Sequence, residues 1–589
     1  MMTTAERLKR SLPEALQSQS LCAPYYGLLP CSKLSKIDDL SSRTRESLLA
    51  EALEYERTLL SLSALLNASA PVNLLPDDVL VKIFAEARPN RYGRTHRSWT
   101  ELSLVCRHWF VVIAAAPTLW CDLEVVDSVS QLRTGLVRSM DHEIGVRVTD
   151  FGSGGWTRPV LPGLPETLDI LTPHAYRLKA LELSPIDDSS VSPLLTFLDT
   201  CTLPRLRSLE AQFPYDLHPG RRILTLTADR VPSLERVRIS HIHVDFASNI
   251  LAQLKVVDLS TSCDPDKPAM TTLETFCGLV HGLINVEELT LSLPGMRGSS
   301  PDAVVALGGK AVLAKLQRLA LCSAPDIVRR ILETISVPAS ACVALRCYDP
   351  EGDMDIQRFL PHDTTSLPHL ALLDTAVITA TATEGHSLKA AMKEDLDPEA
   401  LEFDSLKMEY NLTPYAWAHS LLSPMTMLAG VHRLSKLEHL QVECEPQLVD
   451  EAAIWQPVLS RLPLLRTLSI VVKSEWEEDD EDLPLALWIF QALDPNDPQP
   501  LSPTGLDQRS EGALLCPELE AVYLHGLWAG TDTLVGSVRR CLDNRRRVLG
   551  REYALDDLQI ELETYYGDRE EYVEQLKRLQ ETIDEFVGS

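Results

Sequence analysis

The chain has 589 residues, of which 45% are hydrophobic and 24% charged, enough apolar sequence for one or more large cores. Its 84 acidic and 55 basic residues give a net charge of −29, which argues against nucleic acid and membranes as main partners. The 13 cysteines form no Cys-x-x-Cys pair, so free thiols in a reducing compartment, the cytoplasm or the nucleus, are expected. No apolar run reaches the roughly 18 residues of a membrane span.

Residues 1–39 have no periodic pattern and are expected to be loosely ordered. Within 40–68, apolar residues then recur at alternating four- and three-residue steps, which predicts an amphipathic or coiled-coil-like helix. The helix could pair with a second copy or pack against its own domain. Additional leucines widen the stripe beyond a two-position seam, and this favours packing against its own domain. The seam positions are Leu48, Ala52, Tyr55, Leu59, Leu62 and Leu66.

Segment 72–125 is rich in large apolar side chains at helical spacing. Leu75 and Pro76 precede the acidic pair Asp77 and Asp78, an arrangement typical of a helix N-terminus. A second apolar stretch follows and closes before Pro117. About 50 residues bury little core alone, so the segment is predicted to be a helical module that docks onto a partner.

In residue type, order and spacing, this segment resembles the F-box. The family motif opens with Leu-Pro-x-Asp/Glu-x-Leu/Val-x-x-Ile-Phe, continues to Leu-x-x-Val-Cys-basic-x-Trp and ends near Pro-x-Leu-Trp. The matching residues are Leu75, Pro76, Asp78, Val79, Ile83, Phe84, Leu102, Val105, Cys106, Arg107, Trp109, Pro117, Leu119 and Trp120. A polar insert, 88–97, departs from the shortest family members and is predicted to lengthen a loop. The alternative is that these are three ordinary core helices of a larger domain.

The resemblance implies that the module docks the adaptor subunit of a cullin-based ubiquitin ligase. The side chains expected to carry this docking are Leu75, Pro76, Val79, Leu80, Ile83, Phe84, Leu102, Val105 and Trp109. Some of them must form the module's own core instead, because a small helical module also needs one.

After a segment 126–175, assigned to a linker and domain entry, one phrase recurs: apolar-x-x-apolar-x-apolar. Leu178, Leu206 and Leu234 are 28 residues apart, although other intervals differ. The end of the phrase alternates as a half-buried strand does, and the residues between copies are amphipathic. The copies begin at Arg177, Leu203, Val231, Leu251, Ile284, Leu313, Leu367, Leu434, Leu462, Cys516 and Leu555.

One strand and one helix cannot close a core, whereas stacked copies can. The pattern resembles long leucine-rich repeats, which implies an α/β solenoid over 176–565 with parallel strands and outer helices, for example at 271–283 and 326–335. The Asn or Cys usual three residues after the last strand leucine is missing in several copies, so a less regular array is expected. An ordinary α/β domain with parallel strands is the alternative.

Two insertions are expected to interrupt the array. The one near 381–398 is a polar connection, and the one near 473–512 combines an acidic run with a proline-rich loop. An apolar stripe near the C-terminus predicts a capping helix over 568–589, because the open end of a repeat array needs a polar cap. The basic cluster at 539–547 is interpreted as the outer face of a repeat helix. The alternative is a nuclear-localisation signal.

We find no catalytic, metal or cofactor-binding constellation in the sequence. It contains no Gly-x-Ser-x-Gly or His-Glu-x-x-His motif, and the glycines at 152–155 lack the Lys-Ser/Thr of a phosphate loop. His241 and His243 could share one face of a strand but have no third ligand nearby in sequence. A protein without its own catalysis or cofactor is therefore expected.

Together, the two resemblances imply a substrate-recognition subunit of an F-box ubiquitin ligase, similar to the expanded F-box family of mushroom-forming fungi. Its partners would be the adaptor and, through it, cullin, with an unidentified target protein held by the solenoid beside the loaded enzyme. The alternative is a non-ligase leucine-rich-repeat scaffold or regulatory protein. The strand residues expected to face a target are chemically mixed: Glu210, Arg238, Asp258, Thr290, Gln441, Ser469 and Tyr523.

Overall fold

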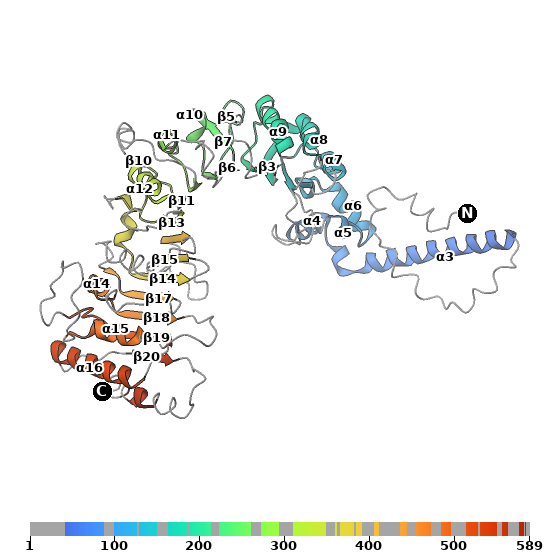
Figure 1. Ribbon diagram of the computed structural model, residues 1–589. Helices are drawn as coiled ribbons and strands as arrows, with labels where there is room; N and C mark the ends of the chain where they lie inside the picture. Colours follow the sequence, from blue (N-terminus) through green and yellow to red (C-terminus); the bar gives the residue numbers. More distant parts are fainter. Residues whose placement is uncertain are drawn as a thin grey trace. The chain divides into compact units, whose positions relative to one another are not determined.

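The computed structural model divides the chain into two compact units, Met1–Leu119 and Trp120–Ser589, each described here by itself (Figure 1). No helix among the described residues is long and apolar enough to cross a membrane. The described residues are 42–87, 99–125, 129–149, 163–184, 186, 188–213, 223–260, 273–293, 310–348, 360–361, 366–381, 385–391, 406–411, 436–444, 455–472, 485–495, 514–527, 531–550, 557–562, 577–581 and 584.

The smaller unit is helical in its described residues (Figure 1). Its elements are α3 (Ser42–Ser69), η3 (Pro71–Leu74), α4 (Asp77–Glu86), α5 (Trp99–Ser103) and α6 (Arg107–Ala115). As predicted, α4 begins directly after Pro76 with two aspartates in its first turn, where the helix dipole favours negative charge. The N-cap of α6 is Cys106, whose Sγ accepts a hydrogen bond from the backbone N–H of Trp109 at 3.5 Å.

The long helix α3 confirms the predicted helix, but its surroundings differ from those expected. Every residue from 45 to 69 is exposed, including Leu59 at 64% and Leu66 at 72%. The favoured interpretation, in which this helix packs against its own domain, is therefore wrong for the described part of the chain. At the C-terminal end of the helix, Asn73 Nδ2 donates a hydrogen bond to the Asn67 carbonyl at 2.6 Å.

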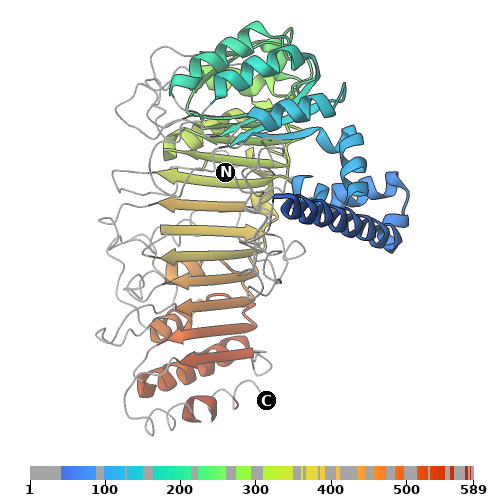
Figure 2. The same cartoon turned by 90° about the vertical axis from the view of Figure 1, so that its right-hand side faces the viewer.

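The larger unit is built on a 16-stranded sheet (Figure 2). Its strand order is β1-β2-β3-β4-β6-β8-β9-β11-β13-β16-β15-β14-β17-β18-β19-β20, and neighbouring strands are parallel except where β15 pairs with β14 and β16. The strands are β1 (Asp122–Val125), β2 (Ile144–Thr149), β3 (Leu178–Ser184), β4 (Ser208–Gln212), β6 (Arg236–Ser240), β8 (Val256–Ser260), β9 (Glu288–Ser292), β11 (Arg318–Ser323), β13 (Cys342–Tyr348), β14 (Thr375–Thr381), β15 (Gly385–Ala391), β16 (Leu406–Asn411), β17 (His439–Cys444), β18 (Thr467–Val472), β19 (Ala521–Leu527) and β20 (Asp557–Leu562). The fold is thus mixed, combining helices with a large and mainly parallel sheet.

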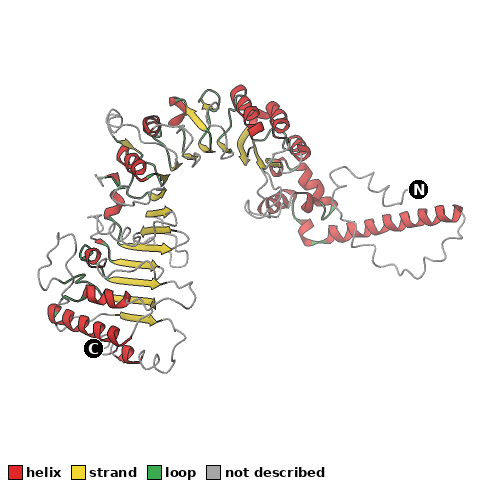
Figure 3. Cartoon of the chain, viewed as in Figure 1, coloured by secondary structure: helices red, strands yellow, loops and turns green. Residues whose placement is uncertain are grey.

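Helices and short turns connect the strands and lie along one face of the sheet (Figure 3). Two smaller parallel pairs, β5 (Ile223–Leu226) with β7 (His243–Phe246) and β10 (Ala311–Val312) with β12 (Ile335–Ser336), lie outside the main sheet. The helices predicted at 271–283 and 326–335 are confirmed as α11 and α12. The connecting elements are η4 (Pro117–Trp120), α7 (Val129–Arg138), α8 (Leu164–Leu171), η5 (Thr172–Arg177), α9 (Asp188–Thr200), α10 (Ser248–Leu251), α11 (Leu273–Gly282), α12 (Pro325–Thr334), η9 (Pro368–Ala371), α14 (Trp455–Leu459), α15 (Leu485–Leu493) and α16 (Thr531–Leu549).

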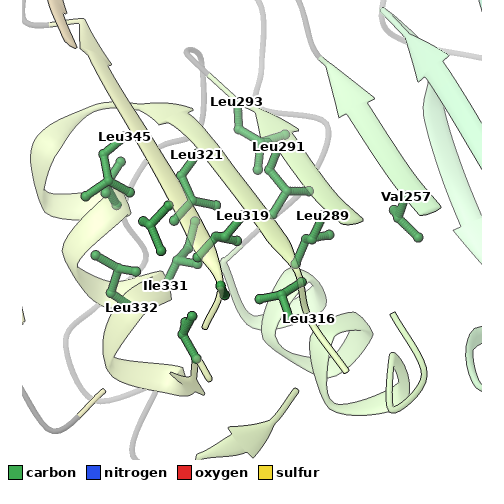
Figure 4. Close-up of a cluster of buried hydrophobic side chains, with 14 of the residues drawn as sticks. Val257, Leu289, Leu291, Leu293, Leu316, Leu319, Leu321, Ile331, Leu332 and Leu345 are labelled. Atoms are coloured by element: carbon green, nitrogen blue, oxygen red, sulfur yellow. The ribbon is translucent and has the colours of Figure 1, made fainter. Parts of the chain in front are cut away.

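The repeated leucines form the core between the sheet and these helices. Leu289 on β9 pairs in register with Leu319 on β11, and their side chains point toward the helical face (Figure 4). Ile331 and Leu332 of α12 cover them, and all four are at most 1% exposed. Burying one such side chain contributes about 1.5–3 kcal/mol. A regular row of them along the sheet therefore explains why the same phrase recurs.

Each predicted copy of the phrase contains a strand except the one at Leu367. There the residues form the turn η9, and β14 begins only at Thr375, with Ala376 and Ile378 facing the core at 0% exposure. The strand was missed because the leucines before it fill the core from a turn.

The sheet also begins earlier than predicted. β1 and β2 lie within or next to the segment assigned to a linker, and Leu123, Val125, Val146 and Val148 face the core. Of the prediction that 126–175 is a linker and the entry to the solenoid, the linker part is therefore wrong, whereas β2 does lie at the start of the sheet. The end of the helical module at 125 is also wrong, because the smaller unit ends at Leu119. These strands are short and rich in valine rather than leucine, so they lack the repeated phrase.

The insertion expected near 381–398 is wrong in part, because β15 occupies 385–391 and enters the sheet antiparallel to its neighbours. The uniform parallel order expected for the array fails here. The insertion near 473–512 likewise contains α15, whose Ile489 and Phe490 are buried at 0% and 1% exposure. The acidic run and the proline-rich loop themselves lie outside the described residues.

Two predictions concern the C-terminal region. The basic cluster lies on α16, and Arg539, Arg540 and Arg547 are exposed there, as expected of an outer face. Arg545 departs from this prediction, because it is only 1% exposed. Its guanidinium donates to the carbonyls of Leu515 and Cys516, both at 2.7 Å. Of the predicted capping helix, residues 577–581 and 584 are described as helical and Leu579 is buried. The rest of that helix, like residues 1–39, lies outside the described residues.

Candidate protein-docking site

The helices α4 and α6 form a small core of their own in the smaller unit. Leu80 and Phe84, one turn apart on α4, are 0% and 1% exposed, and Val112 and Ile113 on α6 are 4% and 0% exposed. The ring of Phe84 lies 4.8 Å from that of Trp109, centroid to centroid, with the planes inclined by 59°. This tilted arrangement is one that aromatic pairs prefer.

A partly buried hydrogen bond fixes the orientation of Trp109. Its Nε1–H donates to Oδ1 of Asn73 at 2.6 Å, so the turn η3 is joined to α6 across 36 residues of sequence. His108 Nε2 also lies 3.6 Å from Asp77 Oδ1, at the start of α4. The two contacts join α6 to both sides of the segment that contains Leu75 and Pro76.

The residues predicted to carry docking fall into three groups. Leu80 and Phe84 are buried, so they belong to those of the nine that form the module's own core, as an amphipathic helix places its most central side chains inward. Pro76, Ile83 and Val105 are exposed, the last two at 40% and 55%. The partly buried ones, which bridge core and surface, are Leu75, Val79, Leu102 and Trp109.

Further apolar side chains of the smaller unit are exposed that sequence reasoning did not assign to docking, among them three at or next to α6. Leu104, Phe110 and Val111 are 49%, 48% and 60% exposed. Leu104 and Val105 lie close before α6, Phe110 and Val111 lie in it, and Ile83 lies on α4. We call these five exposed residues the apolar surface of the smaller unit. Monomeric proteins seldom leave such large side chains grouped in water without a partner.

Trp120, the last residue of the matched motif, belongs instead to the larger unit. The Arg138 guanidinium carbon lies 4.4 Å from its ring centroid, a cation–π contact with α7. The motif therefore ends, in structural terms, at Leu119, which is 3% exposed.

A second candidate surface is the face of the sheet that the helices leave uncovered. The register places Arg147, Glu182, Glu210, Arg238 and Asp258 side by side on consecutive strands, and we call these five residues the charged ladder. Arg147 Nη2 lies 2.6 Å from Glu182 Oε2, and Arg238 Nη1 lies 3.8 Å from Glu210 Oε2. Opposite charges directly across strands stabilise a sheet, whereas Glu182 beside Glu210 opposes it.

Partial burial and crowding alter the acidity of this ladder. The pKa of Glu210 is raised by burial and then by the negative charge of Glu182, with Arg238 acting in the opposite direction. The pKa of Asp258 is raised by burial, against the lowering effect of Arg238. Ionising either carboxyl group is therefore less favourable in the folded chain than in water.

The same row continues toward the C-terminal strands with neutral residues and with Lys407 in register with Lys389. Thr290 is in register with Asp258, and Gln441, Ser469 and Tyr523 are in register with one another, so the expected target-facing residues share one row. Gln441 Nε2 donates to Glu443 Oε1 at 2.8 Å on the same strand. The row is thus charged on its first strands and mixed farther along the sheet, where neutral residues and two lysines occupy it.

No cluster of three or more His, Cys, Asp or Glu side chains suited to a metal ion occurs in the described ranges. A scan against protein-family models gives no match, and a search of curated proteins gives none either. The chemistry of these two surfaces, apolar on the smaller unit and polar on the sheet, suits the binding of other proteins.

Proposed function

We propose that the chain is the substrate-recognition subunit of a cullin-based F-box ubiquitin ligase. The observation that carries the proposal is the apolar surface of the smaller unit, because Ile83 and Val105 of the F-box-like motif remain exposed while Leu80 and Phe84 form a core. A surface of this kind fits an adaptor that covers it with its own apolar side chains. The adaptor would link the chain to cullin.

The larger unit then acts as a leucine-rich-repeat-like solenoid that holds a target protein. Support comes from the repeated phrase, which places a strand in nearly every copy, and from helices restricted to one face of the sheet. The uncovered face is the binding surface in this proposal. Its charged ladder and the mixed remainder of the row offer two chemically different regions for recognition.

Direct binding of the full-length chain to the purified ligase adaptor tests the proposal. Ile83→Asp and Val105→Asp each place a charge at an exposed position, so the fold should persist while affinity falls by at least about 30-fold, the loss expected for a central apolar contact. Val137→Asp is the matched control, because Val137 is 78% exposed on α7 of the larger unit. Equal binding by all variants, or no binding by the folded wild-type chain, would refute the receptor function and favour a non-ligase scaffold.

A further inference from the structure

The helix α3 presents an apolar stripe that no described part of the chain covers. It is 28 residues long, or about 42 Å at 1.5 Å per residue. Along it, Leu48, Tyr55, Leu59, Leu62 and Leu66 are 48–72% exposed. Together with Ala52 they define the α3 seam, whose four- and three-residue steps suit a two-stranded helix pair.

The α3 seam is symmetric about Arg57. Leu48 and Leu66 are equally distant from that residue, as are Ala52 and Leu62, and Tyr55 and Leu59. Two copies running in opposite directions therefore match every seam residue with another. The small Ala52 would face the large Leu62 of the second copy, which fills space well. A parallel pair would instead set Ala52 against Ala52 and leave a gap.

The charges on α3 favour the same direction. The charged residues of α3, which include Glu51 and Glu56, all lie in its first half, up to Arg57. The second half, from Thr58 to Ser69, has no charged residue. In a parallel pair, Glu51 of each helix lies beside Glu56 of the other helix. The pair would therefore contain two contacts between negative charges, and both are repulsive. In the antiparallel pair, Glu51 lies level with Ser63 and Glu56 with Thr58. The helix dipoles also attract one another only in the antiparallel pair.

We propose that α3 joins two copies of this chain as an antiparallel helix pair centred on Arg57. The pair covers the α3 seam with an identical seam, and it places two sheets in one assembly. Two target-binding surfaces acting together would raise the avidity for a repetitive target, if the function proposed above holds. The pairing itself does not depend on that function.

The mass of the full-length chain in solution tests the pairing. Light scattering during size exclusion should give twice the 65.5 kDa of one chain for the wild type. Leu59→Glu should shift the mass to that of one chain at the same concentration, because it puts a charge at the centre of the seam. Leu53→Glu is the matched control: Leu53 is 54% exposed on α3 but outside the seam, so this variant should remain dimeric.

Circular dichroism establishes that both variants are folded, as expected for substitutions at exposed positions. A wild-type chain that stays at the mass of one copy would overturn the proposal, and so would a tetramer. Equal disruption by Leu53→Glu and Leu59→Glu would also overturn it, because the whole helix surface rather than the α3 seam would then be responsible.

The direction of the pair is tested by photo-crosslinking. A benzoylphenylalanine residue introduced at position 48 in full-length chain should link to residues near Leu66 of the other copy. Mixing heavy-isotope and normal chains identifies links between copies by mass spectrometry. Links from position 48 to the neighbourhood of Leu48 in the other copy would show a parallel pair and refute the antiparallel one.

Discussion

Replacing the buried Arg545 by methionine should loosen the packing of α16. The side chain is 1% exposed, and it donates two hydrogen bonds of 2.7 Å to the carbonyls of Leu515 and Cys516. A third contact, to the Leu493 carbonyl at 3.5 Å, is too long to count in full. Methionine fills similar space but donates nothing, so both carbonyls would be left buried without this donor.

Hydrogen bonds to a charged group contribute about 1.5–3 kcal/mol each, so losing the two short ones costs about 3 kcal/mol at the lower limit. Such a loss corresponds to roughly a 100-fold rise in the population of open states, because each 1.4 kcal/mol is about tenfold. Amide hydrogen exchange measured by mass spectrometry should therefore speed up by about that factor in peptides of α15 and α16.

Arg539→Met on the same helix is the control, since Arg539 is exposed. Its effect should stay within about 0.5 kcal/mol, or roughly a twofold change in exchange. If Arg545→Met exchanges like Arg539→Met, the buried guanidinium does not join α16 to the 515–516 segment, and the reasoning is refuted.

Three further changes probe other parts of the molecule. Trp109→Ala removes the ring contact with Phe84 and the hydrogen bond to Asn73, so it should destabilise the smaller unit by about 3 kcal/mol. Amide hydrogen exchange in α4 should then become faster, and unchanged exchange would contradict this prediction. Gly282→Ala puts a Cβ 2.5 Å from Leu251 Cδ1 and 2.9 Å from Leu251 Cβ. The free energy of unfolding measured in urea should therefore fall by about 1–3 kcal/mol. Gly278→Ala is the control, because nothing lies within 4 Å of a Cβ at that position. Glu210→Gln should stabilise the folded chain at pH 7 by less than about 1 kcal/mol, since the Glu210 side chain is 39% exposed. Because the pKa of Glu210 is raised in the folded chain, this gain in stability should shrink as the pH falls toward the unfolded pKa near 4.3. A gain that grows on acidification would refute the direction of the pKa shift.

Much of the large sheet could be predicted because its inward leucines repeat in sequence. Where Leu289, Leu319 and their counterparts recur, one strand follows another and the register brings them together. β15 escaped prediction for the opposite reason: its residues read as a polar connection, and its place in the sheet depends on pairing with β14 and β16. Strand pairing is set by partners distant in sequence, which a local pattern does not contain.

Arg545 illustrates the same limit for a charged residue. The apolar spacing around it predicts a helix, and α16 confirms that helix. Whether an arginine on such a helix faces water or protein depends on which groups it meets, and here two carbonyls from a separate segment receive its hydrogen bonds. Helical periodicity predicts the approximate direction of a side chain, but it does not predict which hydrogen-bond acceptor that side chain meets.

The division of apolar residues in the smaller unit decides which variants can report on docking. Phe84 matches the F-box-like motif as well as Ile83 does, yet Phe84 and its neighbour Leu80 are buried between α4 and α6. Replacing either one would cost about 2–5 kcal/mol of core packing, so lost binding would follow from unfolding whether or not the residue touches an adaptor. Ile83 and Val105 already contact water, and a charge there leaves the core intact. Lost binding in those two variants, with the fold retained, therefore measures docking itself.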